Sequence, residues 1–487
     1  MPIYFNLISL GCPKNQVDSE VMFTNLKRRG IRFTPDIEKS DACVINTCGF
    51  VEAARKESIE TIMDVVRQKM EGGPRYIAVT GCLVNNNLAR LKKEIPEVDI
   101  FLPSFDEDRI AEELLKKAGR PHREKACVKS AIKPFEREHF NLKSTAYLKI
   151  SEGCDRTCSF CAIPGIRGKY LSRRIEEIIK EAGYLSGAGV KELILVSQDT
   201  SYYGTDLNMK NGLYRLLKEL VKIKDIKWIR LMYLYPLKSL FSDDLLSLVN
   251  NEEKILKYLD IPIQHISDNV LKAMKRGSSR KNIINLIERL RNNIKDVSLR
   301  TSLIAGFPGE TEGDFNELLS FVRDAEFDHL GVFKYSDEKA SPSHRLGGKV
   351  KFSVKNERYK ELMLAQAGVL GKIFLKRKEK KYNVIVDRIS GGYITARGYF
   401  QAPDVDGYIF IPATDLKTRR SLFPTEAFVP VKIIKQKGYD LIGSLDGTWY
   451  EHTYHPVSIL TYLLPRINNL SGQATQPRYP APLKHLP

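Results

Sequence analysis

The sequence predicts an α/β protein with three structural parts: an N-terminal α/β domain, an incomplete parallel barrel of six βα units, and a small C-terminal β-barrel. Its 487 residues exceed the size at which one hydrophobic core stops growing, so two or three domains are expected. Apolar, strand-like runs alternate with helical stretches over most of the chain, a pattern typical of parallel sheets. Nearer the C-terminus, short strands follow one another between Gly and Pro turns, which is typical of a small barrel.

The first segment, residues 1–138, is predicted to form the small α/β domain. A helical stretch covers residues 52–69, and residues 125–145 are charged and lack a clear period, which indicates a linker. The strand-like apolar runs of this segment are residues 4–10, 42–45 and 76–79.

The second segment, residues 139–371, repeats a strand and then a helix six times, two short of the eight units of a complete barrel. In barrels of this kind the active site lies at the carboxyl ends of the strands. We expect the incomplete wall to leave a side opening wide enough for a macromolecular substrate. The predicted strands are residues 147–150, 193–196, 228–231, 258–261, 299–304 and 330–333.

The third segment, residues 372–445, is predicted to be the small β-barrel, with a helix at about residues 355–380 leading into it. Residues 446–487 match no pattern that we recognise and form a tail of unknown role. The predicted strands of the barrel are residues 383–386, 408–411 and 427–434.

Composition places the chain among ordinary soluble proteins, with 43% hydrophobic and 28% charged residues. Its eight cysteines are spaced for metal binding and not as a compact disulfide framework, so we expect a reducing, cytoplasmic location. No run of about 18 apolar residues is present, which argues against a membrane partner. The net charge of +18 favours a phosphate-rich partner such as a ribosome or RNA, although a solvated surface can carry a similar excess.

Cys154, Cys158 and Cys161 form a C-x-x-x-C-x-x-C motif directly after the strand-like residues 146–150. Three thiolates in one loop can hold three corners of a [4Fe-4S] cluster, whereas a closed cluster site takes four cysteines. One iron is then left open, and an open position distinguishes a catalytic metal site from a structural one. The alternative is a zinc site or three unrelated buried thiols, but zinc motifs usually pair C-x-x-C with a second ligand pair.

Three further cysteines, Cys12, Cys48 and Cys82, each follow a strand-like run of the first segment. Because the carboxyl ends of parallel strands lie along one edge of a sheet, these distant residues are expected to converge there. A second three-thiolate cluster would result. The alternative, in which free cysteines behave as small hydrophobic residues, suits Cys43 and Cys127 better, since neither follows a strand into a Gly-containing turn.

Taken together, these motifs resemble those of the methylthiotransferases of the radical S-adenosylmethionine (SAM) superfamily, and within them the RimO type, which modifies a ribosomal protein. The resemblance covers about residues 1–445. It is carried by Ser9-Leu10-Gly11-Cys12-Pro13-Lys14-Asn15, Asp18-Ser19-Glu20, Asn46-Thr47-Cys48-Gly49-Phe50, the Cys154–Cys161 loop, Ser197-Gln198-Asp199-Thr200, Tyr203-Gly204, Pro262-Ile263-Gln264-His265 and Gly306-Phe307-Pro308-Gly309-Glu310-Thr311.

The resemblance implies a radical SAM partial barrel in the middle of the chain and a TRAM domain as the C-terminal barrel. It also implies two [4Fe-4S] clusters, with the amine and carboxylate of SAM filling the open position of the first. The second cluster would carry the sulfur that is methylated and then joined to the β-carbon of an aspartate in a small-subunit ribosomal protein of the uS12 type. An electron donor such as flavodoxin or ferredoxin would reduce the first cluster. No catalytic residue beyond the cluster cysteines is expected.

Several residues at strand ends are candidates for contacts with SAM. A glycine-containing turn after the fifth barrel strand lets the backbone approach a cofactor closely, although an ordinary Pro-Gly turn has the same pattern. Polar side chains at other strand ends can donate or accept hydrogen bonds, although each of them can equally be structural. The candidates are Gly306, Phe307 and Pro308 in the turn, and Gln198, Gln264, His265 and Thr301 at the strand ends.

Asp404 and Asp406 are candidates for substrate binding, because residues 402–407 resemble the ribosomal-protein type of the family. Two carboxylates on a turn repel RNA phosphates and attract a basic ribosomal protein. The alternative is a turn that uses aspartate only for backbone hydrogen bonds.

Two other functions compete with modification of a ribosomal protein. The first is a sister methylthiotransferase that acts on a tRNA adenosine beside the anticodon. The second is a non-enzymatic iron-sulfur or zinc scaffold that binds RNA, which the absence of SAM cleavage by the reconstituted protein would favour.

Overall fold

A computed structural model describes residues 2–104, 109–119, 136–140, 144–412 and 428–445. Most of the expected linker at 125–145 and the whole tail at 446–487 therefore lie outside the described residues. Within the described part, no helix is both long enough and apolar enough to cross a membrane.

The N-terminal domain is built on a parallel five-stranded sheet in the order β2-β1-β3-β4-β5. Neighbouring residues of its central strand point to opposite faces, so that Val44 packs into one hydrophobic cluster and Ile45 into the other. Both faces are thus covered, as parallel sheets require. The elements are β1 (Tyr4–Ser9), α1 (Pro13–Arg28), β2 (Arg32–Phe33), η1 (Ile37–Lys39), β3 (Ala42–Thr47), α2 (Glu52–Met70), β4 (Tyr76–Gly81), α3 (Cys82–Glu94), β5 (Ile100–Phe101) and α4 (Ile110–Lys117).

The middle part contains a six-stranded parallel sheet whose strands follow in chain order from β6 to β13, which confirms the incomplete barrel. Its strands are β6 (Thr145–Lys149), β9 (Glu192–Val196), β10 (Trp228–Leu231), β11 (Ile255–Asp260), β12 (Ser298–Ala305) and β13 (His329–Lys334). A short hairpin is added by β7 (Ser151–Glu152) and β8 (Leu171–Ser172). The helices are α5 (Ile163–Arg167), α6 (Ile175–Gly187), η3 (Thr200–Tyr202), α7 (Gly212–Leu220), η4 (Lys238–Leu240), α8 (Asp243–Asn251), α9 (Asp268–Ala273), α10 (Arg280–Asn293), α11 (Glu312–Ala325) and η5 (Pro342–Arg345).

The long helix α12 (Phe352–Arg377) leads into a closed five-stranded barrel in the order β14-β15-β16-β18-β17, which confirms the predicted small barrel. Two of its strands, β15 and β18, were not predicted. Each is only five residues long and follows a tight turn, made by Gly391 and Gly392 or by Gly438, all with positive φ. The strands are β14 (Lys381–Ser390), β15 (Tyr393–Arg397), β16 (Ile409–Pro412), β17 (Phe428–Lys437) and β18 (Asp440–Ser444).

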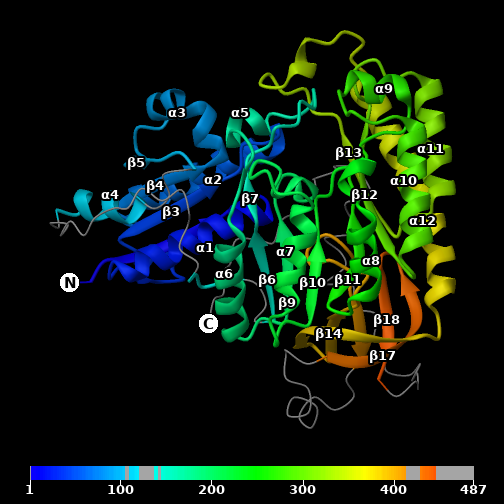
Figure 1. Cartoon of the computed structure of the whole chain (residues 1–487). Coiled ribbons are helices and arrows are strands. Elements are labelled where there is room, and N and C mark those ends of the chain that lie inside the picture. The colour runs from blue at the N-terminus through cyan, green and yellow to red at the C-terminus, as the bar shows by residue number, and fades with distance from the viewer. Residues whose placement is uncertain (1, 105–108, 120–135, 141–143, 413–427, 446–487) are drawn as a thin grey trace.

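The C-terminal barrel packs against the amino-terminal ends of the six-stranded sheet, opposite the cysteine loops (Figure 1). Arg397 of β15 pairs at 2.8 Å with Glu192, the first residue of β9. His329, the first residue of β13, contacts the carbonyl oxygen of Phe400 at 2.5 Å. The carboxyl ends of the strands, at the other side of the sheet, are therefore left to the N-terminal domain and the motif loops.

Candidate active site

The loop of Cys154, Cys158 and Cys161 lies between β7 and α5, beyond the carboxyl end of β6. It begins at Gly153, whose φ is +70° and whose added Cβ would lie 1.9 Å from the carbonyl oxygen of Lys169. Only glycine fits this entry without a shift of backbone. The loop geometry is therefore built for one particular path of the three cysteines.

Each sulfur of this loop has a hydrogen-bond donor close to it. The backbone N–H groups of Arg156 and Ile163 donate to Cys154 and Cys161, both at 3.4 Å, and Arg276 Nη1 donates to Cys158 at 3.4 Å. Burial raises the pKa of the Cys161 thiol to about 12 and also raises that of Cys154. Binding of a metal cluster must therefore displace protons, and the donors then stabilise the thiolates.

Tyr235, just beyond the end of β10, is held between two arginines that support the same loop. The guanidinium carbons of Arg156 and Arg276 lie 4.3 Å and 4.1 Å from the centroid of its ring. The Tyr235 hydroxyl lies 3.8 Å from the Cys158 sulfur, and Arg156 pairs at 2.8 Å with Asp199. Sequence reasoning missed these residues, although Tyr235 follows a strand end as the predicted residues do.

The cysteines of the N-terminal domain converge at the carboxyl edge of its sheet. Cys12 precedes α1, Cys48 follows β3 and Cys82 begins α3. A Cβ added to Gly11 would lie 2.9 Å from Cys48 Cβ, and one added to Gly49 would lie 2.8 Å from the carbonyl oxygen of Cys82. Burial, reinforced by the neighbouring thiols, raises the pKa of Cys48 to about 12. The predicted convergence of the three loops is therefore present.

All six cysteines of the two sets are free thiols in the structure. In the described part of the chain, no group of three or more His, Cys, Asp or Glu side chains is arranged to hold one metal ion. A structural zinc ion needs its ligands around one point, about 2.3 Å away for sulfur, whereas each cysteine of a cubane cluster binds a different iron. None of the seven described cysteines forms a disulfide, so both sets are available as ligands.

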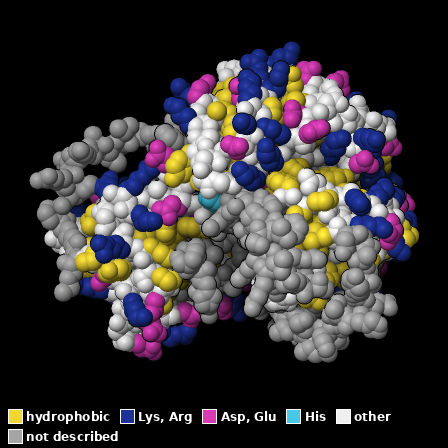
Figure 2. All heavy atoms as spheres, turned by 90° about the horizontal axis from the view of Figure 1, so that it is seen from below, with side chains coloured by type: hydrophobic (Ala, Val, Ile, Leu, Met, Phe, Trp, Pro, Cys, Tyr) yellow, Lys and Arg dark blue, Asp and Glu magenta, His cyan; other side chains and the backbone are white. Residues whose placement is uncertain are grey.

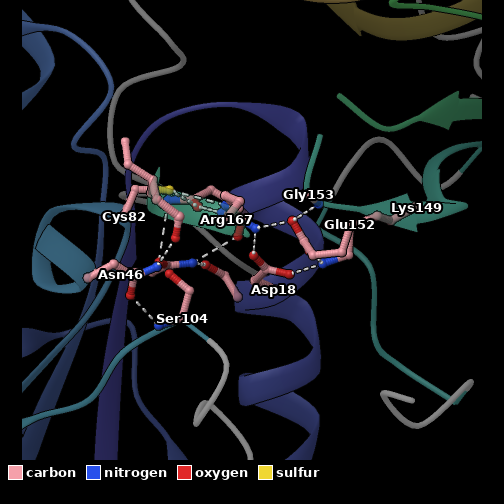
Figure 3. A network of polar contacts seen from close by, with 12 residues as sticks. Asp18, Asn46, Cys82, Ser104, Lys149, Glu152, Gly153 and Arg167 are labelled. Carbon is pink, nitrogen blue, oxygen red and sulfur yellow. Dashed lines mark hydrogen bonds and ion pairs between the residues drawn. The ribbon is translucent and has the colours of Figure 1, made fainter. Parts of the chain in front are cut away.

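A network of polar side chains joins Cys82 of the N-terminal domain to Arg167, Lys149 and Glu152 of the partial barrel (Figure 3). Cys82 packs directly against Ala162 and Ile166, which follow the last cysteine of the other loop. Arg167, at the end of α5, donates to the Cys82 sulfur at 3.3 Å. The edge of the N-terminal sheet is thus joined to the loop of the partial barrel.

The turn of Gly306, Phe307 and Pro308 is fixed by Glu310. One oxygen of this carboxylate accepts the backbone N–H groups of Gly306 at 2.8 Å and Phe307 at 3.1 Å, and Arg358 pairs with the other at 2.7 Å. The Phe307 ring is buried against Tyr335, so its side chain serves the core. Glu310 and Arg358 were missed, although Glu310 lies within the family motif.

Gln264 and His265 form a strained segment beside this turn. Gln264 has a φ of +73°, which is uncommon for a residue with a side chain and costs about 1–3 kcal/mol. Burial lowers the pKa of His265 to about 3, so its imidazole is neutral at physiological pH. Its Nδ1 accepts the Ser267 N–H at 3.0 Å, and its Nε2 lies 3.7 Å from Glu310.

Thr301 and Gln198 differ in whether the side chain has a hydrogen-bonding atom left for a cofactor. The Thr301 hydroxyl donates to the carbonyl of Ile261 and accepts from the N–H of Ile263, so it fastens neighbouring strands, which favours the structural alternative. Gln198 donates its side-chain N–H to Glu152 at 3.3 Å, and its buried Oε1 has no partner among the described residues. Of these two, Gln198 is the better candidate for a cofactor contact.

Asp406 is buried, whereas the sequence predicted that its carboxylate would be available to bind a substrate. It is 6% exposed, and its carboxylate accepts from the Tyr258 hydroxyl at 2.8 Å and lies 3.4 Å from Arg300 and 3.3 Å from His329. These partners lie in β11, β12 and β13, so Asp406 attaches the C-terminal barrel to the partial barrel. The expected presentation of this carboxylate to a basic partner is wrong because the docked barrel buries it.

Asp404 is exposed, but it too contacts the partial barrel, because its carboxylate accepts from the Tyr147 hydroxyl at 3.0 Å. Figure 2 views the molecule from the side of the C-terminal barrel. On the described part of that face, Lys and Arg side chains are interspersed with Asp and Glu, and no large acidic patch gathers. A role of Asp404 in substrate binding stays a prediction.

Replacing Asp406 with asparagine is expected to destabilise the protein by about 3 kcal/mol, because the buried Arg300 guanidinium loses a negative partner. Asp404→Asn, in the same turn but exposed, is the matched control and should cost less than about 1 kcal/mol. Urea denaturation followed by tryptophan fluorescence measures both. Equal costs for the two variants would contradict the interdomain role of Asp406.

Comparisons with known proteins agree with this architecture part by part. The model of the Radical SAM superfamily matches residues 148–322, that of Uncharacterized protein family UPF0004 matches residues 4–103, and that of the TRAM domain matches residues 380–445. Among solved structures, radical S-adenosylmethionine methyltransferase TsrM from Kitasatospora setae aligns with a TM-score of 0.53. It covers 70% of this chain and 77% of its own at 12% identity, which shows a shared fold alone.

Curated relatives cover nearly the whole described chain. The chain is 41% identical over 448 residues to ribosomal protein uS12 methylthiotransferase RimO of Clostridium botulinum, strain Eklund 17B, covering 90% of this chain and 97% of that protein. It is 44% identical over 451 residues to the protein of the same name from Acetivibrio thermocellus, with coverages of 90% and 97%. The chain therefore belongs to the RimO family of methylthiotransferases, within the radical SAM superfamily.

Proposed function

We propose that this enzyme transfers a methylthio group to the β-carbon of an aspartate in ribosomal protein uS12. The observation that carries the proposal is the contact between the two cysteine-bearing parts of the chain, in which Cys82 packs against Ala162 and Ile166, residues that follow Cys161. Relatives more than 40% identical over 90% of the chain bear the name of ribosomal protein uS12 methylthiotransferase. Membership of the family and the geometry of the site thus support the same reaction.

The chain's own residues fit the cofactors of the superfamily. Cys154, Cys158 and Cys161 would hold a [4Fe-4S] cluster with one iron open to SAM. When bound and reduced, these cofactors supply the radical that breaks an unactivated carbon–hydrogen bond. The protein fixes the loop at Gly153 and keeps Tyr235 and its flanking arginines packed against it.

The residues that follow the barrel strands would bind SAM mainly through a preorganised backbone and less through charged side chains. Glu310 holds the turn at Gly306 and Phe307 in a single conformation, which preorganises the backbone beside the cofactor. Gln198 keeps a free buried acceptor, and His265 remains neutral beside the turn. Burial of these groups excludes water from the radical chemistry.

Cys12, Cys48 and Cys82 would hold a second [4Fe-4S] cluster, which would supply the sulfur to be transferred. Two features support this. Their loops touch one another, and their thiols are shielded from solvent enough to raise the pKa of Cys48 and of Cys82. The total would be about eight irons per chain.

The partners follow from charge and from the third domain. The net charge of +18 and a TRAM domain support contact with RNA of the small ribosomal subunit. The reductant would be a flavodoxin or ferredoxin, because the reaction needs single electrons at low potential. With these partners the enzyme would act in the cytoplasm.

Mass spectrometry of cells with and without the gene tests the substrate. The proposal predicts that an aspartate of uS12 gains one methylthio group only when the gene is present. In the same cells, methylthio-adenosine in tRNA should not depend on the gene. Gene-dependent methylthio-adenosine with unmodified uS12 would overturn the proposal in favour of the tRNA enzyme.

A further inference from the structure

Arg167 is a buried guanidinium at the junction of the two cysteine sets. It is 3% exposed and follows Cys161 by one short helix. On the side of the N-terminal domain, its Nε donates to the Cys82 sulfur at 3.3 Å and its Nη2 donates to Asn15 Oδ1. Figure 3 shows this guanidinium lying between Cys82 and the acidic residues of the network.

The same side chain binds two carboxylates, one from each domain. Nη1 donates to Asp18 of α1 at 2.9 Å and to Glu152 of β7 at 3.1 Å. Lys149 donates to the same two carboxylates, at 2.7 Å in the case of Glu152. Burial opposes the charge on Arg167, but Glu152 and Asp18 outweigh it and raise the pKa further above its ordinary value. The residue is therefore a permanent cation beside a cysteine sulfur.

A second buried arginine shows that joining the domains does not require contact with sulfur. Arg137 is 1% exposed, pairs with Glu20 of α1, and pairs at 2.8 Å with Glu181 of α6. It thus spans the same two domains with comparable burial, while its bonds go to two carboxylates and a backbone carbonyl. The contact of Arg167 with Cys82 needs an explanation beyond domain docking.

We propose that Arg167 is a positioning residue for the second cluster: its Nε–H bonds the Cys82 sulfur, orients that ligand toward the radical SAM loop and raises the reduction potential of the cluster. This inference rests on the second cluster of the proposed function. A hydrogen bond and a positive charge at a ligand sulfur stabilise the more negative, reduced state of a cluster. The nearby Asp18 carboxylate acts in the opposite direction.

Whether Arg167 raises the reduction potential can be tested in a protein that holds only the second cluster. The first cluster cannot form in a variant that lacks its three ligands, Cys154→Ala/Cys158→Ala/Cys161→Ala. A redox titration of this variant, followed by electron paramagnetic resonance, therefore reports only the second cluster. In this background, Arg167→Gln is expected to lower the reduced-to-oxidised ratio at a fixed potential at least tenfold. For a one-electron couple, that fold-change corresponds to a shift of about 59 mV.

Three further variants distinguish a direct effect of Arg167 on the reduction potential from a general loss of structure. Arg167→Lys keeps the charge but loses the fork, so the potential should fall by less than in Arg167→Gln. Asp18→Asn removes a negative charge and should raise the potential, a sign that general loosening does not predict. Arg137→Gln breaks the other interdomain arginine and should leave the potential of the cluster unchanged.

The outcomes distinguish this inference from the proposed function. A background protein that forms no cluster would overturn both. A cluster whose potential is the same in Arg167→Gln and Arg137→Gln would overturn the role of Arg167 alone. If Arg167→Gln does not fold, Arg167→Lys and Asp18→Asn decide, because shifts of the same sign, or none, would contradict the inference.

Discussion

The protein with Cys158 replaced by alanine is expected to bind about four irons instead of about eight, and to lose all cleavage of SAM. Cys158 is one of three ligands in its loop, and its sulfur is bonded by Arg276 and lies near Tyr235. With only two thiolates left in the loop, too few ligands remain to hold the first cluster. Iron analysis and detection of 5′-deoxyadenosine after anaerobic reconstitution measure both effects.

Cys43→Ala is the matched control for this variant. Cys43 is fully buried in the N-terminal core, within the hydrophobic cluster that includes Ile45 and Val79. Its replacement should lower stability by no more than about 1 kcal/mol and leave iron content and SAM cleavage unchanged. Full iron and full cleavage in Cys158→Ala would show that the radical site has been assigned to the wrong cysteines.

The protein with Cys48 replaced by alanine is expected to lose methylthio transfer while keeping SAM cleavage measurable. Cys48 lies against Gly11, and the neighbouring Cys12 and Cys82 thiols contribute to the rise in its pKa. Iron content should fall by about half. The measurement is parallel assay of 5′-deoxyadenosine and of methylthiolated uS12 in the same reaction.

Two outcomes would contradict this division of labour. Retained methylthio transfer by Cys48→Ala would remove the second cluster from the reaction. Loss of cleavage together with transfer would mean that the two cysteine sets form one functional unit, with no separate roles.

The convergence of the N-terminal cysteines could be predicted because it depends on a general property of parallel sheets. Cys12, Cys48 and Cys82 each follow a strand, and the carboxyl ends of β1, β3 and β4 lie side by side. No knowledge of side-chain packing is needed for that step. The six units of the partial barrel were predictable for the same reason, since each strand is a separate apolar run.

Arg167 and Tyr235 could not be predicted because their roles depend on how separate elements dock. Arg167 and Cys82 are 85 residues apart and belong to different domains. Tyr235 and Cys158 are 77 residues apart and follow different strands, β10 and β7. Neither residue stands in a pattern of spacing that distinguishes it from the many other arginines and tyrosines of the chain.

The burial of Asp406 did have a signal in the sequence, which lay in its partners. Buried parallel strands usually consist of continuous apolar runs, yet Glu192 and Arg300 interrupt β9 and β12 near their amino-terminal ends. Charged residues at such positions indicate that something polar covers that end of the barrel. The C-terminal barrel does so, through Arg397 as well as Asp406.

The central claim is that this enzyme methylthiolates uS12 and needs both cysteine sets to do so. Purified components test this claim most directly. The reconstituted enzyme, SAM, a chemical reductant and isolated 30S subunits are incubated without oxygen, and uS12 is analysed by tandem mass spectrometry. The account predicts one methylthio group on an aspartate β-carbon with the unaltered enzyme, and none with Cys158→Ala or Cys48→Ala. Unmodified uS12 in the presence of active SAM cleavage, with methylthio-adenosine formed when tRNA is supplied instead, would contradict it.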